Sequence, residues 1–441
     1  MLKNKKNVTL FFLLIIVITF YLPYFNVISW GGDYGTYLDQ GKTMFTEEFN
    51  DFIENQKELL QYQNNRYPIY TPFGFPLLIK LFSYFHDYDL IKVKILIPTL
   101  LFFTIYFLYM NLKSKYKFPL VLSIVVNPNI QDQFREIQTE IPTTFLLIIG
   151  MFSKNKLLKN SFFLFSVLSR PSFLLFVLVY YLYELKNAQS YKNLLAFFTY
   201  LIGIHIFLLN NFNLKFYGFY ETQFNTSGTL DILTNNLNLI SIDSFSFIIF
   251  ELGRLLTGFS SQFNYFLGSL LIIYLILTKN KYSIMSLVFI VVHNFWIAGY
   301  YVRYFLPILF LLVLSFDKYI STKDKHSDKF IYTLFFGYLL INTILSVINI
   351  SNLELQRGPL ERNSSEMLVF IDENYINRDQ LLFTFHSPRV FNFLTGKKSY
   401  VNDKSLKEGT IVICEYKNEI CIYPDNYKTV FKNKNYIILE P

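Results

Sequence analysis

Residues 29–76 open with SWGGDYGTYLDQGKTMF (29–45) and close with NNRYPIYTPFGFP (64–76). They follow directly after an apolar run from Val8 to Ile28, and about 20 apolar residues suffice for one helix to cross a bilayer. The stretch therefore starts with a carboxylate, Asp33, at a membrane surface and ends in a Tyr/Pro/Gly/Phe segment typical of an ordered loop. A carboxylate just outside a membrane helix suggests chemistry at the membrane face.

The composition predicts a multi-pass membrane protein. Of 441 residues, 52% are hydrophobic and 16% are charged, whereas soluble domains have about 25% charged residues. The apolar runs are also too many and too long for the core of a soluble protein. The start, MLKNKK and then an apolar run, resembles a signal peptide, but the run is too long and no small-x-small cleavage site follows. We therefore expect a retained first helix.

The charge distribution predicts the orientation. The formal charge is +8, and residues 351–441 contain 12 basic and 12 acidic residues, so the excess lies in residues 1–350. It is concentrated as lysines in short loops between apolar runs, and such loops are cytoplasmic by the positive-inside rule. Lysines interleaved with membrane spans argue against nucleic acid as the partner.

About eleven crossings follow from this alternation, with the N-terminus inside and the C-terminus outside. The expected helices lie near 8–28, 90–111, 117–128, 141–152, 160–169, 172–185, 193–209, 264–278, 282–299, 304–317 and 330–350. Several are short for a full span. The path places the loops 29–89, 128–140 and 210–263 outside, so that residues 1–350 form an all-α polytopic membrane domain.

Residues 351–441 are expected to form a small extracytoplasmic α/β domain. A helix is expected at 364–375 and a short one at 388–394, and strands are expected at 380–385, 399–402, 410–416, 420–423 and 436–439. A turn at Lys417 and Asn418 would place Cys414 opposite Cys421, with Cβ atoms about 4.5–5.5 Å apart. An oxidising compartment would permit a disulfide; the alternative is two unrelated buried thiols. The spacing has no zinc signature.

Asp33 is the leading candidate for chemistry. A carboxylate facing water at a helix end can act as a general base toward a hydroxyl or as a metal ligand. The ordinary alternative is the N-cap of an interfacial helix that begins at Tyr34.

A second acidic group lies in NPNIQDQFREIQTEIP. Asp132, Glu136 and Glu140 are spaced by four, which would place them on one face of a helix, and Glu140 would begin a membrane helix. Such a face is usually just solvated. Its position in a short loop between spans favours a functional role.

The cationic candidates are Arg66, Arg170, Arg254 and Arg303. An arginine at membrane depth is costly and usually has a partner, and a phosphate fits its guanidinium fork. The alternative is snorkelling to the interface. His205 and His293 indicate packing, and no phosphate-binding glycine loop or dinucleotide fingerprint is present.

The arrangement resembles the GT-C superfamily of membrane glycosyltransferases, in particular the protein O-mannosyltransferase, aminoarabinose transferase and RgtA-like branches. The segments that carry the resemblance are GGDYGTYLDQGK (31–42), RYPIYTPFGFPLL (66–78), REIQTEIP (135–142), LSRP (168–171), VRYFLP (302–307) and HSPRVFNFLTGKKSYV (386–401). The resemblance covers most of the chain. This chain lacks the Asp-Glu pair of the O-mannosyltransferases and has Asp33-Tyr34 in its place, which argues against protein O-mannosylation.

The resemblance implies a function. Such enzymes move a sugar from a polyprenyl-phosphate donor to an acceptor hydroxyl on a glycan, glycolipid or protein at the outer face, by inversion. The implied base is Asp33, supported by Glu136 and Glu140. The implied contacts to lipid phosphate or sugar are Arg66, Tyr67, Arg170, Arg254, Arg303 and Tyr304. A divalent metal (Mg, Mn or Zn) would be held by Asp33, Asp132 and Glu136. The implied location is the plasma (inner) membrane.

Two other functions remain open. An O-antigen polymerase or ligase is also multi-pass with essential arginines, but its large loop falls late and no tail domain follows. A lipid or sugar transporter should show internal hydropathy repeats and charges near mid-membrane. No repeat is evident here, and the ionisable residues lie at helix ends.

Overall fold

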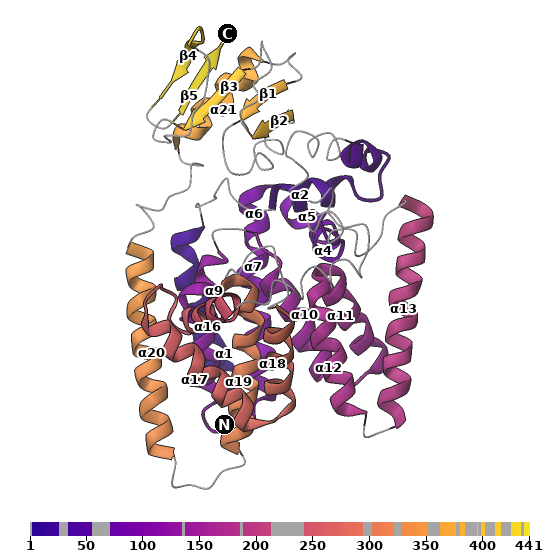
Figure 1. Cartoon of the computed structure of the whole chain (residues 1–441), viewed down its shortest axis with the longest axis vertical. Coiled ribbons are helices and arrows are strands. Elements are labelled where there is room, and N and C mark those ends of the chain that lie inside the picture. The colour runs from indigo at the N-terminus through magenta and orange to yellow at the C-terminus, as the bar shows by residue number, and fades with distance from the viewer. Residues whose placement is uncertain are drawn as a thin grey trace.

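The computed structural model describes most of the chain. The described residues are 2–25, 34–54, 71–134, 137–185, 188–212, 242–293, 302–321, 328–351, 362–375, 380–383, 395, 398–401, 411–415, 425–433 and 436–441. They form a large helical domain and a smaller C-terminal α/β unit (Figure 1).

The long helices of the helical domain run roughly parallel to its long axis (Figure 1). They are α1 (Leu2–Tyr21), α7 (Leu96–Asn111), α8 (Lys117–Val125), α10 (Glu140–Phe152), α11 (Lys156–Ser169), α12 (Leu174–Glu184), α13 (Ala188–Phe212), α17 (Phe263–Thr278), α18 (Lys281–His293), α19 (Leu306–Ser321) and α20 (Asp328–Ser351). We call the end next to the C-terminal unit proximal and the opposite end, where the chain starts, distal (Figure 1).

Three described helical stretches are long and apolar enough to cross a membrane: Leu90–Asn111, Tyr191–Asn211 and Val302–Ser321. Six shorter apolar helices accompany them. The outermost helices carry exposed apolar side chains; on α20, Phe336 is 61% exposed and Leu340 is 52% exposed. Hydrocarbon on the surface of a helix is stable where lipid replaces water, so these faces fit a bilayer.

Short helices cover the proximal end, between the long helices and the C-terminal unit (Figure 1). They are α2 (Tyr34–Thr43), α4 (Gly74–Leu81), α5 (Ser83–His86) and α6 (Leu90–Lys94). Two further short segments, α9 (Pro128–Asp132) and the 3-10 turn η3 (Val302–Phe305), precede long helices. The helical core is largely Leu, Ile, Val and aromatic, and a pair such as Phe176 and Phe289 stacks with centroids 4.3 Å apart.

One element differs from the prediction. Residues 210–263 were expected to form an outer loop, but α16 (Ile242–Thr257) lies within them. Its buried residues Ile248, Leu252 and Leu255 follow helical spacing, and Glu251 and Arg254 interrupt the apolar run. A hydropathy reading misses such a helix because the two charged residues lower the average. Helix α16 packs closely on α17, since a Cβ on Gly253 would lie 1.9 Å from the backbone carbonyl oxygen of Asn264.

Within the described residues, the C-terminal unit is a five-stranded mixed sheet with the helix α21 (Arg362–Asn374). The strands are β1 (Gln380–Phe383), β2 (Lys398–Val401), β3 (Ile411–Glu415), β4 (Lys428–Lys432) and β5 (Tyr436–Glu440), in the order β2-β1-β3-β5-β4. β1 is parallel to β2 and β3, and β5 is antiparallel to β3 and β4. The prediction missed β4, and the expected elements at 388–394 and 420–423 lie outside the described residues.

Cys414 lies on β3, buried, with Ile437 of β5 as its antiparallel neighbour. It is disulfide-bonded. Cys421, the other cysteine of the sequence, lies outside the described residues, as does the predicted turn at Lys417 and Asn418.

Candidate active site

The first acidic segment is anchored to the later part of its loop. Helix α2 begins at Tyr34, directly after Asp33 in the sequence. Gln40 on α2 donates to the carbonyl oxygen of Thr71 at 3.0 Å and accepts from its backbone nitrogen at 2.9 Å and its hydroxyl at 2.7 Å. These buried bonds hold α2 beside the TPFG segment. Of the predicted site residues, Asp33, Arg66, Tyr67 and Glu136 lie outside the described residues.

The TPFG segment in turn packs against the residue that precedes Arg170. A Cβ on Gly74 would lie 2.4 Å from both the backbone nitrogen and the hydroxyl of Ser169. No side chain fits there without moving backbone, so glycine allows the start of α4 to approach the end of α11. Sequence motifs almost 100 residues apart therefore meet at one place.

Arg170 and Glu140 form a buried ion pair at the proximal end. Glu140 is the first residue of α10, and its side chain is 4% exposed. Arg170 lies in extended backbone between α11 and the short turn η2 (Pro171–Phe173), with its side chain 14% exposed. Its Nη1 donates to Oε1 of Glu140. A buried charge of either sign would be costly alone, so each residue stabilises the other.

Tyr304 brings a second arginine to this pair. The Arg170 guanidinium lies 4.7 Å from the centroid of the Tyr304 ring, and that of Arg303 lies 5.1 Å from it. Arg303 also donates to the Tyr304 hydroxyl at 3.4 Å. Two guanidiniums are thus held at one tyrosine ring, and a guanidinium suits an anion such as phosphate. We call Glu140, Arg170, Arg303 and Tyr304 the arginine cluster.

A second ion pair adjoins the arginine cluster through the backbone of η3. Glu251 on α16 is buried; its Oε1 lies 3.5 Å from Nη1 of Arg254, and the backbone of Val302 hydrogen-bonds to it. Val302 immediately precedes Arg303. The sequence singled out Arg254 but missed Glu251; the available signal was a carboxylate three residues before an arginine, a spacing that pairs side chains on a helix.

Helix α9, which carries Asp132, is fixed to the end of α16. Asn129 donates to the carbonyl oxygen of Arg254 at 3.0 Å. Gly258 has φ +79°, and a Cβ there would lie 2.5 Å from Pro128. The second predicted loop therefore lies against the segment that holds Glu251 and Arg254.

The predicted acidic face in this loop is wrong. Asp132 ends α9 and Glu140 begins α10, and the described residues between them are not helical, so no single helix presents Asp132, Glu136 and Glu140 together. Pro142 gives the reason. Inside a continuous helix its ring would clash with the carbonyl of Gln138, whereas in the first turn of α10 it has no such neighbour.

Several buried polar atoms near these helix ends have no hydrogen-bond partner within the described part of the chain. They are both amide atoms of Gln131, the hydroxyls of Ser169 and Ser172, Oε2 of Glu251 and Nε of Arg254. Buried polar groups are nearly always paired, so a group of them deserves an explanation. A polar ligand at the proximal end would provide partners for such atoms.

Lys94 is a buried cation outside the set of predicted site residues. It ends α6, is 1% exposed, and donates to the carbonyl oxygen of Tyr24 at 2.5 Å. Tyr24 and Tyr21 pack edge-on against Phe134, so this lysine lies where the ends of the first and second loops meet. The signal was a lysine on the side where positive charge is disfavoured.

An apolar hollow of about 470 Å³ lies between α8, α16, α17, α19 and α20. Its walls are mostly leucine, with Tyr338 and Ser123 among the few polar residues. The Tyr338 hydroxyl accepts from Asn127, and Asn127 also donates to the Leu255 carbonyl oxygen at 2.9 Å. Asn127 therefore links Tyr338, which lines the hollow, to the end of α16 next to Arg254.

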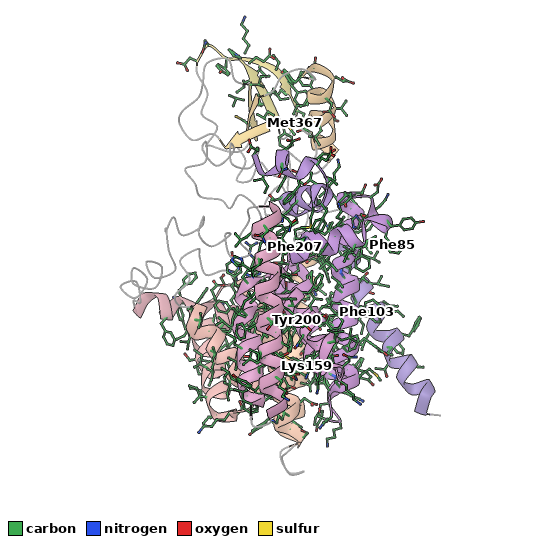
Figure 2. The ribbon with its side chains drawn as sticks, turned by 90° about the vertical axis from the view of Figure 1, so that its right-hand side faces the viewer. Phe85, Phe103, Lys159, Tyr200, Phe207 and Met367 are labelled. Carbon is green, nitrogen blue, oxygen red and sulfur yellow. The ribbon has the colours of Figure 1, made fainter. Side chains whose placement is uncertain are left out.

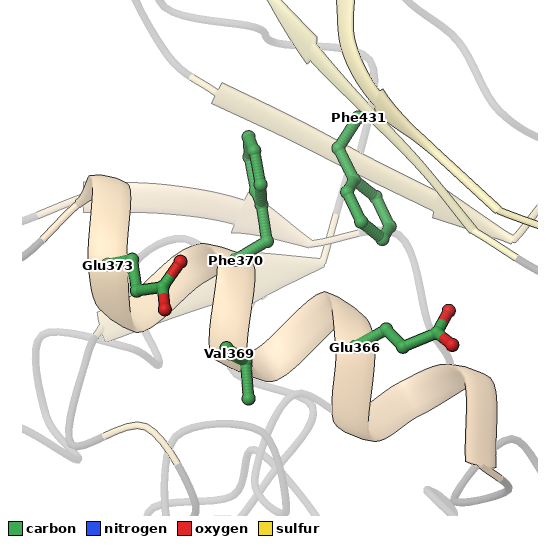
Figure 3. Close-up of a pocket in the computed structure, with 5 residues that line it drawn as sticks. All are labelled: Glu366, Val369, Phe370, Glu373 and Phe431. Carbon is green, nitrogen blue, oxygen red and sulfur yellow. The ribbon is translucent and has the colours of Figure 1, made fainter.

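A second hollow, of about 450 Å³, lies on the C-terminal unit. Figure 3 shows Phe370 of α21 and Phe431 of β4 on the side of the helix that faces the sheet, and Val369 on the opposite side. The two rings have centroids 4.9 Å apart. Glu366 and Glu373 line its rim, so its charge is opposite to that of the arginine cluster.

The metal prediction is not tested by the described residues. No three acidic, histidine or cysteine side chains among them come together as a ligand set. Two of the predicted ligands, Asp33 and Glu136, lie outside that part of the chain. The Glu140 carboxylate is occupied by Arg170. A divalent ion on Asp33, Asp132 and Glu136 therefore stays a prediction.

Fold and site together define a polytopic helical protein of the membrane with an arginine–carboxylate cluster at one end and an α/β unit above it. The solved structures with this fold include ArnT from Cupriavidus metallidurans. The form bound to undecaprenyl phosphate has a TM-score of 0.56 and 9% identity, covering 96% of each chain. The apo form has a TM-score of 0.55 and 9% identity, covering 100% of this chain and 98% of its own. No protein-family model and no curated protein sequence matches. The helical membrane fold with a small C-terminal sheet, expected from the sequence resemblance, is confirmed, whereas the eleven crossings and their orientation stay predictions.

Proposed function

We propose that the protein is a membrane glycosyltransferase that moves a monosaccharide from a polyprenyl-phosphate donor to an acceptor hydroxyl at the proximal face. The observation that carries the proposal is the arginine cluster, in which Arg170 and Arg303 share one tyrosine ring beside Glu140. A related fold binds undecaprenyl phosphate. A lipid phosphate is the anion that such a cluster suits.

The residues would divide the chemistry between them. The donor's glycosidic C–O bond to phosphate breaks, and the acceptor oxygen forms a new bond to the same carbon with inversion. Asp33 takes the acceptor proton, and the departing polyprenyl phosphate keeps the bonding electrons. Arg303 and Arg170 stabilise the charge that develops on that phosphate, and Glu140 holds Arg170 in place. No nucleotide pocket is needed, because the donor carries its own leaving group.

The apolar hollow supports the same donor. It opens among lipid-compatible helices and ends near Asn127 and Arg254, where a polar head would meet cations. A prenyl chain is branched hydrocarbon and fits walls of leucine. We also propose about eleven membrane crossings. The proximal end and the C-terminal unit would then lie on the outer side of the plasma (inner) membrane.

The test is sugar transfer in proteoliposomes from a panel of radiolabelled polyprenyl-phosphate sugars. We expect Asp33→Asn to lose about 10²–10⁴-fold in turnover, the usual share of a positioned base. The matched control is Asp87→Asn, because Asp87 is an exposed acid of the same loop in a left-handed conformation that asparagine accepts. Its turnover should stay normal.

If the Asp33→Asn variant transfers label as fast as wild type, Asp33 is not the base. No transfer from any lipid donor by folded protein would overturn the proposal and favour the polymerase, ligase or transporter functions. The sugar that wild type accepts names the donor class.

Metal use is a separate proposal, with Asp33, Asp132 and Glu136 as ligands. Dialysis against EDTA should then abolish transfer, and Mg²⁺, Mn²⁺ or Zn²⁺ should restore it. Full activity after dialysis would contradict the metal proposal. The arginines alone would then stabilise the charge on the departing phosphate.

A further inference from the structure

An exposed stretch without charged residues lies at the proximal end, where α4 ends and α5 begins. In this stretch Leu81 is 64% exposed, Phe82 37%, Tyr84 93% and Phe85 75%. The ring centroid of Phe85 lies 5.7 Å from that of Tyr84 and 6.3 Å from that of Phe82. We call these four residues the aromatic patch. A run of exposed apolar residues is unfavourable in water and marks a surface that binds something.

The packing of α4 and α5 leaves the aromatic patch on the surface. Gly74, Phe75 and Ile79 form the buried side of α4, which packs against α2 and α11. His86, the last residue of α5, is also buried, and its Nε2 lies 2.9 Å from the carbonyl oxygen of Ile79. Both short helices are therefore held from their inner side, and their remaining large apolar side chains face outward.

The aromatic patch continues into the apolar surface of a predicted membrane span. After α5 the chain enters α6 and α7, where Ile91 is 37% exposed, Ile95 45% and Phe103 43%. Residues 90–111 are long and apolar enough to cross a membrane. Figure 2 shows Phe85 and Phe103 on the same side of the helical domain, with Phe85 nearer the C-terminal unit. A bilayer that covers Phe103 therefore extends toward the aromatic patch at its proximal edge.

The residue types of the aromatic patch fit the edge of a bilayer. Tyrosine concentrates at membrane–water interfaces, because its ring is apolar and its hydroxyl reaches water. Lys92, which is exposed, follows on α6, and a lysine at this depth keeps its ammonium group among the lipid head groups. Phenylalanine and leucine gain from contact with hydrocarbon. Lipid therefore suits the whole patch.

We propose that the aromatic patch inserts into the leaflet of the bilayer at the proximal end, with its rings at the level of the lipid head groups. The partner is thus a lipid surface. This inference is independent of the proposed transfer reaction, because it depends only on the exposure of the patch and its continuity with α7.

Insertion of the aromatic patch would set the position of α2 relative to the bilayer. Tyr88, just after α5, donates its hydroxyl to the carbonyl oxygen of Gly41 at 3.3 Å. Nζ of Lys80 donates to the carbonyl oxygen of Lys42 at 3.3 Å. Both acceptors belong to α2, which begins directly after Asp33 in the sequence. An anchored patch would therefore hold the first loop at a fixed height above the lipid.

The test is electron paramagnetic resonance of the full-length protein in liposomes, with a nitroxide label on the variant Phe85→Cys. Collisions of the label with oxygen, which concentrates in the bilayer, are compared with collisions with a water-soluble nickel chelate. The variant Phe103→Cys is the bilayer reference. Val369→Cys, at a 54% exposed position on α21, is the water reference. Wild type treated with the same reagent measures any label on Cys414 and Cys421.

We expect the ratio of oxygen to nickel collisions at residue 85 to approach that of Phe103→Cys and to exceed that of Val369→Cys. A ratio equal to that of Val369→Cys would place the aromatic patch in water and overturn the proposal. A label that collides with neither reagent would also overturn it, since a protein surface would then cover the patch. Tyr84→Cys and Ile91→Cys repeat the measurement, and thermal unfolding in detergent identifies any variant that does not fold.

Discussion

The two ends of the helical domain each hold a lysine or arginine beside a glutamate, and the two pairs differ in burial. At the proximal end the side chains of Arg170 and Glu140 are 14% and 4% exposed, and at the distal end those of Lys281 and Glu184 are 20% and 31% exposed. The deeper pair uses arginine, whose planar fork is weakly hydrated and keeps its charge. The shallower pair uses lysine, which stays hydrated. In these two pairs the more buried cation is the arginine, and the more buried pair is the one expected to bear function.

The largest expected effect is that of Arg170→Ala. It leaves Glu140 buried without its cation, which typically destabilises a protein by about 3–5 kcal/mol. Transfer should fall by about 10²–10³-fold if the arginine stabilises the leaving phosphate. Arg170→Lys keeps the charge without the fork and should recover most of the stability and little of the activity. Thermal unfolding in detergent and the transfer assay measure the two effects; equal activity of the lysine variant and wild type would show that charge alone suffices.

Gly74→Ala tests how the arginine is positioned. The new Cβ would meet the backbone nitrogen and hydroxyl of Ser169 at 2.4 Å, so the end of α11 must move. Overpacking of this kind costs about 1–3 kcal/mol, and a displaced Arg170 should lower turnover. Gly203→Ala is the control, because a Cβ added at this position would have no neighbouring atom within 4 Å and alanine favours a helix interior. Its unfolding temperature should stay level or rise, and a similar loss in both variants would contradict the packing argument.

Lys281→Ala should have a smaller effect than Arg170→Ala. The pair with Glu184 is partly exposed, and the contact of Lys281 with the Tyr180 ring is modest, so we expect a loss of about 1 kcal/mol. Transfer should be unchanged, because the distal end is far from the arginine cluster along the helices. Lys154→Ala, at an exposed position of the same end, is the comparison for the unfolding temperature. Loss of transfer in Lys281→Ala would mean that the two ends are coupled.

Asp39→Asn examines a carboxyl on α2, at the proximal end. Burial, more than the nearby Glu48, raises the pKa of Asp39 from 3.8 to about 6, against the opposing effect of Lys42. A raised folded-state pKa means that the folded state holds the proton more tightly, so stability is greatest below pH 3.8 and falls as the pH rises to about 6. Asp39→Asn should therefore be more stable than wild type at pH 7, by about 1 kcal/mol after solvent screening. The advantage should vanish near pH 4, and a pH-independent difference would contradict the assignment.

Much of the fold followed from local composition, and much of the site did not. The long apolar runs predicted most long helices within a few residues, because burial in lipid requires a continuous apolar segment. The sequence analysis missed helix α16 because Glu251 and Arg254 interrupt its apolar pattern. It missed β4 because this edge strand is mostly exposed and shows little alternation of apolar and polar residues. Of the candidate residues, Glu140, Arg170, Arg303 and Tyr304 were singled out from the sequence, and the structure brings them together.

The sequence by itself determined where apolar segments lie, which loops are basic, and that arginines and carboxylates occur at helix ends. Each of these depends on residues that are close in the chain. Only the tertiary structure decided that Arg170 pairs with Glu140, that Tyr304 contacts two guanidiniums, and that Asp132 and Glu140 belong to different helices. Arg170 is 30 residues from Glu140 and 134 residues from Tyr304 in the sequence, and packing contacts such as that of Gly74 against Ser169 help to bring them together.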